Sequence, residues 1–247
     1  MAIIDSLRAY WKFDESSGNA ADAHTGGHTL TNNGTIPYVA AKLNNGADLE
    51  ATDAADFFEK ADHADFDITT NLSISCWINI ESAIGAGGYR ILADKFEDTG
   101  SQKSYALFLT NNGGTLQVIF TKTTDGATRT DMVVNWAFST ATWYHLVSVY
   151  DDTAKTTEFF VDGSSIGTSS AVAASGIYSG TATFRVGNGH ADFFGSGWWD
   201  GIIDEYGIWA KKLTSAEVTS LYNGGTPMAY PFTEATSGKN FLMFMPA

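Results

Sequence analysis

The chain has 247 residues, 44% of them hydrophobic and 13% aromatic, which is enough to bury the core of one large domain. Its formal net charge of −14 repels phosphate backbones and its 14 basic residues form no cluster, so the composition argues against nucleic-acid binding. The single cysteine, Cys76, excludes an internal disulfide, and no stretch is long and apolar enough to predict a transmembrane helix.

Apolar residues in alternating or short continuous runs, separated by glycine-rich and polar turns, predict a succession of short strands. The first strand places Leu7, Ala9, Trp11 and Phe13 on one face. Further strands are predicted at residues 55–60, 72–80, 89–95, 104–110, 115–121, 143–150, 157–161, 181–186 and 201–209. This spacing is typical of an all-β sandwich. Residues 143–150 are apolar on both faces, which predicts a central strand whose second face is also covered.

Two tight turns and one helix punctuate this pattern. Residues 111–114 and 162–163 contain the asparagine, aspartate and glycine residues that tolerate positive φ, so both segments predict hairpins. Thr214 and Glu217 form a capping-box pattern, and the apolar stripe that follows ends at residues 223–224. The sequence therefore predicts one short helix near the end of the domain.

Five motifs occur in a fixed order: AYWKFDE at 9–15, LSISCWI at 72–78, TWYHLV at 142–147, FVDG at 160–163, and GIIDEYGIW at the start of segment 201–222. Together they resemble the laminin G-like, concanavalin A-like lectin/glucanase jelly rolls over about residues 7–224. The resemblance implies a two-sheet antiparallel jelly-roll sandwich with one short C-terminal helix. Because the residues after the predicted helix depart from the domain pattern, we divide the chain into a jelly roll at 1–229 and a C-terminal extension at 230–247. Members bind glycans or proteins, often with a calcium ion, and many are non-catalytic.

The resemblance also implies a structural calcium site. Asp204 is predicted to share a strand face with Tyr206 and Ile208, where a buried carboxylate needs compensation that calcium provides. In the resembling modules an acidic residue after the first strand and one near this position help to hold the ion. This implies Asp14, Asp22 and Asp204 as ligands here, with Glu205 as a weaker candidate. In the alternative interpretation Asp204 and Asp14 accept backbone hydrogen bonds and cap loop turns without a metal.

An aromatic loop at residues 189–200 is the glycan-contact candidate. Flat aromatic faces stack on sugar rings, while neighbouring polar groups orient the sugar hydroxyls. The predicted contact residues are His190, Asp192, Phe193, Phe194, Trp198, Trp199 and Asp200. The alternatives are that the aromatic residues fold back as core or form a protein interface.

No catalytic arrangement emerges from the sequence. Retaining glycosidases need two carboxylates about 5–5.5 Å apart, and the glucanases that share the jelly roll place them on one strand face. Asp204 and Glu205 are adjacent on a predicted strand, so their side chains are expected on opposite faces. Nucleophile elbows, phosphate loops and zinc-protease motifs are absent from the sequence. We therefore expect a non-enzymatic protein.

The functional prediction depends partly on the residues at the two ends of the sequence. The first residues show neither a basic region nor an apolar run typical of a secretory signal. Residues 241–245 are strongly apolar and are expected either to dock on a partner or second copy, or to complete the chain's own sheet. The sequence thus predicts a phage virion surface component, a capsid decoration or tail-associated protein that contacts capsid or tail proteins and presents a glycan-binding face. The alternative is a carbohydrate-binding or adhesion module of an extracellular bacterial protein.

Overall fold

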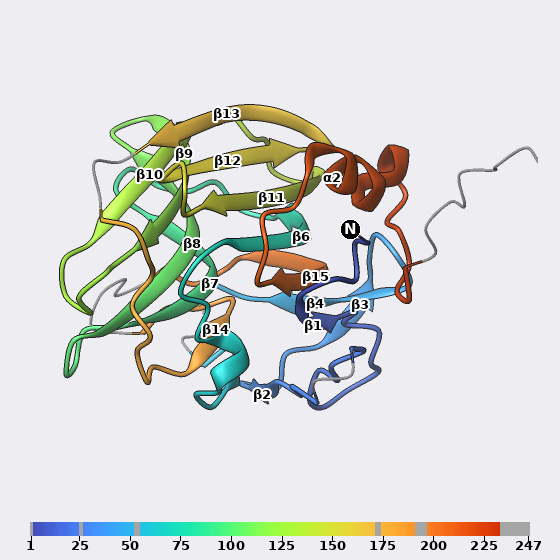
Figure 1. Ribbon diagram of the computed structural model, residues 1–247. Coiled ribbons are helices and arrows are strands. Elements are labelled where there is room, and N and C mark those ends of the chain that lie inside the picture. Colours follow the sequence, from blue (N-terminus) through green and yellow to red (C-terminus); the bar gives the residue numbers. More distant parts are fainter. Residues whose placement is uncertain (1, 25–26, 52–54, 171–173, 191–196, 233–247) are drawn as a thin grey trace, which may run out of the picture.

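The computed structural model describes residues 2–24, 27–51, 55–170, 174–190 and 197–232. Within these residues the strands form two antiparallel sheets that pack as layers (Figure 1). The eight-stranded sheet runs in the order β13-β12-β11-β6-β15-β4-β3, and β1 also pairs with β15. Its strands are β1 (Leu7–Trp11), β3 (Tyr38–Ala40), β4 (Asn45–Leu49), β6 (Leu72–Ile80), β11 (Trp143–Asp151), β12 (Thr156–Val161), β13 (Ser164–Ser170) and β15 (Gly201–Trp209).

The seven-stranded sheet has the order β10-β9-β8-β7-β14-β5-β2. Its strands are β2 (Thr31–Asn33), β5 (Phe57–Lys60), β7 (Tyr89–Glu97), β8 (Gln102–Asn112), β9 (Thr115–Lys122), β10 (Thr130–Asn135) and β14 (Phe184–Val186). Residues 111–114 connect β8 to β9 as predicted, because Gly113 and Gly114 both have positive φ.

The main core lies between the two sheets. Trp11 on β1 stacks on Phe184 of β14, with ring centroids 5.9 Å apart, so side chains of opposite sheets are in direct contact. Phe66, in the 3₁₀ helix η1 (Ala64–Phe66), stacks on Phe184 at 4.9 Å. The predicted all-β, two-sheet jelly-roll sandwich is confirmed, and burial of both inner faces is its main source of stability.

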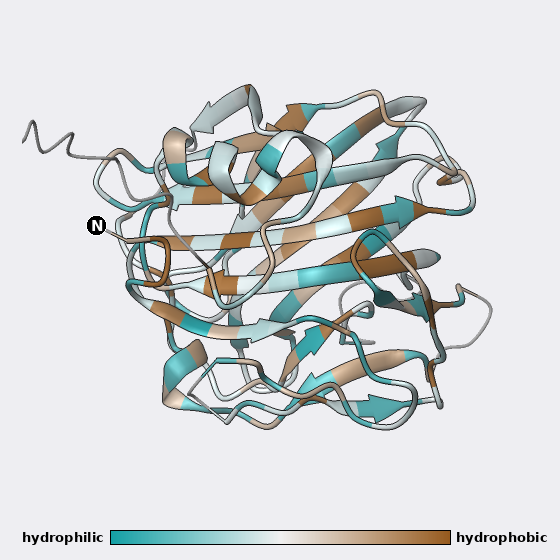
Figure 2. Cartoon of the chain, turned by 90° about the vertical axis from the view of Figure 1, so that its right-hand side faces the viewer, coloured by the Kyte–Doolittle hydropathy of each residue, from teal (hydrophilic) through white to brown (hydrophobic). Residues whose placement is uncertain are grey.

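The outer face of the eight-stranded sheet carries α2 (Ser215–Tyr222) and the short η2 (Asn223–Gly225) (Figure 2). The predicted capping box of Thr214 and Glu217 is present, and Asn223 ends the helix in the left-handed conformation. Val218 and Leu221 pack there against Val147 of β11, which confirms that β11 is covered on both faces. None of the described helices has the length and apolar character that crossing a membrane requires.

A β-bulge at Glu205 changes which way β15 directs its side chains. Asp204 lies opposite Trp77 and Gly207 lies opposite Ser75, so between these two pairs β15 has one residue more than β6. Glu205, within this bulge, has a φ of 48°. Asp204 therefore shares the outer face with Trp77, whereas Tyr206 lies in the main core. The prediction that Asp204 shares a face with Tyr206 and Ile208 is wrong, because the extra residue reverses the alternation.

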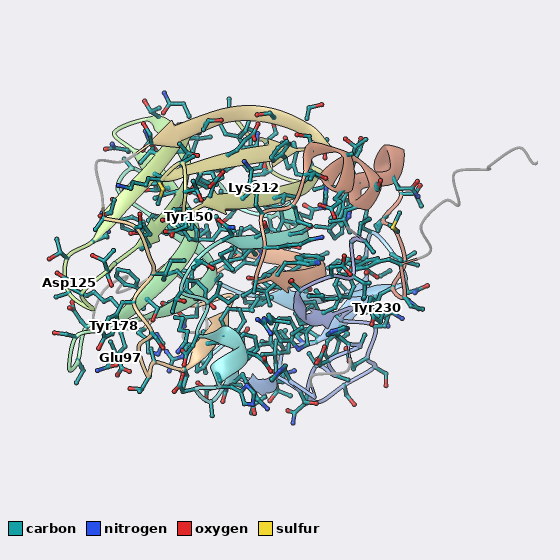
Figure 3. The ribbon with its side chains drawn as sticks, in the orientation of Figure 1. Glu97, Asp125, Tyr150, Tyr178, Lys212 and Tyr230 are labelled. Atoms are coloured by element: carbon teal, nitrogen blue, oxygen red, sulfur yellow. The ribbon has the colours of Figure 1, made fainter. Side chains whose placement is uncertain are left out.

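The chain continues to pack on this outer face after α2. Tyr230, labelled in Figure 3, stacks on Tyr10 with ring centroids 5.2 Å apart, and Phe232 contacts both Tyr10 and Trp209. Residues through Phe232 thus contribute to the same apolar cluster as α2. The rest of the predicted extension, including residues 241–245, lies outside the described residues.

Candidate functional site

A groove lies on the outer face of the seven-stranded sheet, away from the main core. Cross-strand pairing aligns Ile91 of β7, Phe108 of β8, Ile119 of β9 and Val133 of β10 in one row. These side chains belong to a small apolar cluster separate from the core between the sheets. The groove has a volume of about 240 Å³ and is lined by Gly87, Tyr89, Phe108, Thr110, Asn111, Asn112, Gln117, Ile119, Arg129, Asp131 and Val133.

Polar groups surround this apolar floor. The Arg129 guanidinium lies 2.6 Å from one carboxylate oxygen of Asp131, whose other oxygen, Oδ1, is buried without a hydrogen-bond partner. Gln117 Nε2 donates to Asn135 Oδ1 at 2.9 Å on the neighbouring strand. The "sheet groove", as we call this surface, therefore combines an aromatic and aliphatic floor with donors and acceptors, which is the composition of many small-ligand sites.

The end of the predicted aromatic loop borders the sheet groove. The backbone N–H of Ile91 donates to the Gly197 carbonyl at 2.9 Å, which ties the loop to β7. Gly197 also packs against Tyr89, since a Cβ at this position would lie 3.2 Å from the Tyr89 Cβ. Trp198 follows directly and is half-buried. The sequence-based candidate and the groove thus meet at Tyr89.

The remaining predicted glycan-contact residues that the structure describes do not line the sheet groove. Trp199 is 1% exposed and belongs to the main core, so its ring is not available for stacking on a ligand. Asp200 is buried and accepts a hydrogen bond from the Ala51 N–H at 3.0 Å. Asp192, Phe193 and Phe194 lie outside the described residues.

His190 is a buried anchor of the loop. Its backbone N–H donates to Asp94 Oδ2 at 2.8 Å, its Nδ1 lies 3.1 Å from Asp94 Oδ1, and its Nε2 lies 3.1 Å from Thr183 Oγ1. Asp94 is fully buried on β7. Both ring nitrogens therefore have protein partners, and the side chain holds the loop to the sheet rather than facing a ligand.

A pair of buried carboxyl groups occupies the bulge of β15. Asp204 Oδ2 accepts from the Leu43 N–H at 2.8 Å, and Glu205 Oε2 accepts from the Tyr10 hydroxyl at 2.5 Å. The remaining oxygens, Asp204 Oδ1 and Glu205 Oε1, are buried without hydrogen-bond partners. Tyr10 belongs to the outer-face cluster, so the bulge directs both carboxyl groups to the same side, contrary to the expectation of opposite faces.

Burial is the main reason that both groups resist ionisation. Burial, with a smaller contribution from the neighbouring charges of Glu205 and Asp14, raises the pKa of Asp204 to about 8. Burial likewise raises the pKa of Glu205 to about 7, with the Asp14 charge adding to the effect. Asp14 itself lies 3.0 Å from Lys12 Nζ. The structure therefore brings Asp14, Asp204 and Glu205 into one electrostatic group.

Asp22 does not join this group. Its Oδ1 accepts from the backbone N–H groups of Tyr10 and His24, at 3.0 and 2.9 Å, and its Oδ2 accepts from that of His28 at 3.0 Å. Asp22 also forms an isolated antiparallel β-bridge with Trp11, on the side of β1 opposite to β15. Asp22 is therefore a carboxylate that accepts backbone hydrogen bonds within a loop, apart from the other two predicted calcium ligands.

Sequence comparison places this architecture in a family. The family model Laminin_G_3, described as the concanavalin A-like lectin/glucanases superfamily, matches residues 52–219. The chain belongs to this superfamily. The matched region contains the sheet groove and the acid pair, while Asp14 and Asp22 precede it. A search of curated protein sequences finds no match.

Solved structures of similar fold are binding domains. The binding domain of Paraclostridial Mosquitocidal Protein 1 has 15% identity and a TM-score of 0.70, over 90% of this chain and 53% of that one. The binding domain of botulinum neurotoxin DC in complex with SialylT has 13% identity and a TM-score of 0.68, over 91% and 52% of the two chains. This superfamily member thus spans about half the length of the toxin domains.

A third similar structure matches over nearly its whole length. Domain 4 of AbnA, a GH43 extracellular arabinanase from Geobacillus stearothermophilus, was solved in complex with arabinotriose. It has 18% identity and a TM-score of 0.59, over 88% of this chain and 98% of that one. At such identities these likenesses establish a shared fold, and the function of this superfamily member must be argued from its own site.

Proposed function

We propose that the chain is a non-enzymatic glycan-binding module and that the sheet groove, together with Trp198 at its border, is the binding surface. The observation that carries the proposal is the row of Phe108, Ile119 and Val133 beneath a rim that includes Tyr89 and the Arg129–Asp131 pair. Aromatic and aliphatic surfaces contact the C–H faces of a sugar, and charged and amide groups orient its hydroxyls.

Two further observations support this proposal. Two of the similar structures, a neurotoxin binding domain and Domain 4 of the arabinanase, were solved in complex with SialylT and with arabinotriose, respectively. In addition, the acid pair offers no accessible catalytic site, because Asp204 is fully buried and Glu205 is 2% exposed. Hydrolysis of a glycan would require carboxyl groups that reach the substrate.

Alanine variants of the groove test the proposal. A glycan array identifies a ligand, and calorimetry then measures its dissociation constant for the wild-type chain, Tyr89→Ala and Trp198→Ala. We expect each substitution to weaken binding at least about tenfold, which corresponds to about 1.4 kcal/mol. Tyr178→Ala is the control, because Tyr178 is also half-buried but does not line the sheet groove. Equal affinity of all four proteins, or no glycan bound by the wild type, would contradict the proposal.

Calcium at the acid pair is a second part of the proposal. The unpartnered oxygens Asp204 Oδ1 and Glu205 Oε1, together with the Asp14 carboxylate, are the hard oxygen ligands that calcium prefers. A bound ion would supply the positive charge that these buried groups lack. Asp14 also accepts the Asn45 N–H at 3.3 Å and lies 3.0 Å from Lys12 Nζ, so an ion would compete with these contacts. Asp22 does not fit, because its charge, unlike that of Asp14, is not among those that raise the pKa of Asp204 and Glu205.

One more specific function stays a prediction: a capsid decoration or tail-associated protein at the surface of a phage virion. The apolar segment 241–245 on which docking to capsid, tail or a second copy depends lies outside the described residues. The competing prediction is a carbohydrate-binding or adhesion module of an exported bacterial protein. Mass spectrometry of purified virions tests the first, and neighbouring genes for polysaccharide-degrading enzymes would favour the second.

A further inference from the structure

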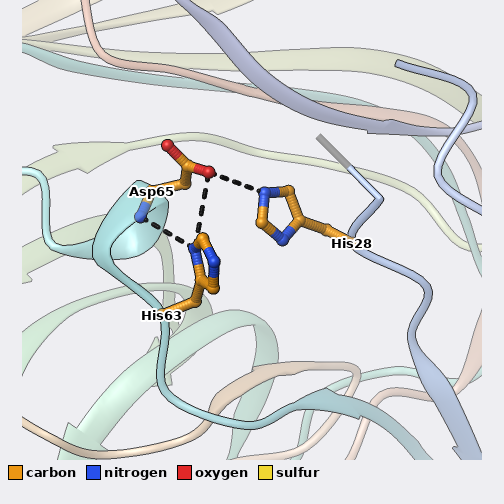
Figure 4. A group of neighbouring side chains, drawn as sticks. All are labelled: His28, His63 and Asp65. Carbon is orange, nitrogen blue, oxygen red and sulfur yellow. Dashed lines mark hydrogen bonds and ion pairs between the residues drawn. The ribbon is translucent and has the colours of Figure 1, made fainter. Parts of the chain in front are cut away.

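Two histidines and an aspartate converge at the edge of the sandwich, in a place that the glycan proposal does not use (Figure 4). His28 Nε2 lies 2.9 Å from Asp65 Oδ2, and His63 Nδ1 lies 3.4 Å from the same oxygen. One ligand atom from each of the three residues lies within 4.8 Å of the others. Ligands of a tetrahedral zinc ion at about 2.0–2.1 Å lie roughly 3.3 Å apart, so small side-chain movements suffice to enclose one.

The local hydrogen bonds bring an unprotonated nitrogen close to the carboxylate. His63 is the N-cap of η1, and its Nδ1 accepts the Asp65 N–H at 3.1 Å, so this nitrogen carries no proton. The same nitrogen lies 3.4 Å from Asp65 Oδ2, which is also an acceptor, and two acceptors without a proton between them repel each other. Because Nδ1 has a single in-plane lone pair, an ion bound there would replace the hydrogen bond from the Asp65 N–H and remove this repulsion.

Other contacts hold the three side chains in position. His28 is 1% exposed, its backbone N–H donates to Asp22, and its carbonyl accepts from the Trp11 indole N–H at 2.7 Å. Its ring packs edge-on against Phe66 at 4.9 Å. Such support fixes a metal ligand before the ion binds, which lowers the entropic cost of binding.

The donor set selects the kind of ion. Two imidazole nitrogens and one carboxylate oxygen favour zinc and related late transition metals over calcium or magnesium, which prefer all-oxygen sites. Arg8 lies 3.3 Å from Asp65 Oδ1, the oxygen not shared by the histidines, and leaves Oδ2 for the ion. We propose that His28, His63 and Asp65 form a binding site for a divalent transition-metal ion, with Zn²⁺ as the best-matched ion.

The site would have structural and chemical consequences. It would join the segment that contains His28 to η1, two parts of the chain that lie about 35 positions apart in sequence. The side chain of His63 is 48% exposed, so the ion would lie at the surface and retain a coordination position for water or an external ligand.

Metal titration of the untagged, full-length chain tests this proposal. After removal of metals with a chelator, calorimetry with Zn²⁺ should show one site per chain, and Co²⁺ should give the visible absorption of a nitrogen- and oxygen-ligated ion. His63→Ala removes one ligand at an exposed position and should weaken Zn²⁺ binding at least about tenfold. His24→Ala is the matched control, because His24 contacts Tyr230 and lies outside the cluster.

Three results would overturn the proposal: no stoichiometric Zn²⁺ binding by the wild-type chain, unchanged affinity in His63→Ala, or an equal loss in His24→Ala. Circular dichroism and the melting temperature of the metal-free variants confirm that each is folded. Glycan binding is measured separately, so failure of the metal site and failure of the sheet groove remain distinguishable.

Discussion

Replacing Asp204 by asparagine should remove a pH-dependent loss of stability. Burial raises the pKa of this carboxyl group to about 8, whereas an unfolded aspartate has a pKa of about 3.9. Between these values the folded chain binds the proton and the unfolded chain releases it. The stabilisation is therefore complete below about pH 4 and is lost as the pH rises towards 8. Asparagine keeps the shape, its carbonyl can accept the Leu43 N–H, and it does not titrate.

The size of the effect follows from the pKa difference. One pKa unit corresponds to about 1.4 kcal/mol, so the titration of Asp204 should lower the free energy of unfolding by about 4 kcal/mol between about pH 5 and pH 8. Glu205, whose pKa is raised to about 7, contributes in the same direction. Relative to the wild type, Asp204→Asn should gain stability across this interval.

Urea unfolding at several pH values, in the presence of a chelator, measures this difference. The control is Asp125→Asn, because hydrogen bonds from Thr128 hold the pKa of this exposed aspartate at about 2, and it stays ionised throughout. Its difference from the wild type should be constant with pH. A constant difference for Asp204→Asn as well would refute the argument that a buried, protonated carboxyl group is present.

Three further predictions concern the same outer face. Millimolar calcium at neutral pH should raise the melting temperature of the wild-type chain and leave that of Asp204→Asn unchanged. Scanning calorimetry of both proteins measures this difference, and an equal response of the two would show that the acid pair does not bind the ion. Thr214→Ala should cost about 1 kcal/mol in urea unfolding through loss of the helix cap, while Ser215→Ala, at an exposed neighbouring position, should cost less. A chain ending at Thr226 should melt at a lower temperature than one ending at Phe232, because it loses the rings of Tyr230 and Phe232 that pack on Tyr10 and Trp209. Equal melting temperatures of the two would show that this packing contributes nothing.

The strands with strong local patterns could be predicted from the sequence. Residues 72–80 and 201–209 match β6 and β15 at both ends, because apolar residues predominate in both segments and both strands are buried along most of their length. The helix was equally predictable, since a capping box and a left-handed asparagine are local features. By contrast, β2, β3, β4, β10 and β13 were missed, because these strands are short or half-exposed and are defined mainly by their partners.

The candidate sites depended much more on tertiary contacts. Asp94 lies in a strand that the sequence predicted, but its contact with His190 depends on the tertiary structure, in which it is fully buried. The sheet groove escaped notice because Tyr89, Phe108 and Asp131 are unexceptional within their own strands. His28 and His63 could not be paired from the sequence, since nothing local indicates that η1 lies beside the segment containing His28.

The sequence by itself determined the superfamily, the sandwich and the position of its helix, because strand alternation, turns and caps depend on neighbouring residues. Only the tertiary structure decided which side chains meet. A single extra residue at Glu205 placed both carboxyl groups on the outer face, and strand register assembled the sheet groove from four strands. Register and bulges arise from the fit between strands distant in sequence, so a local pattern does not encode them.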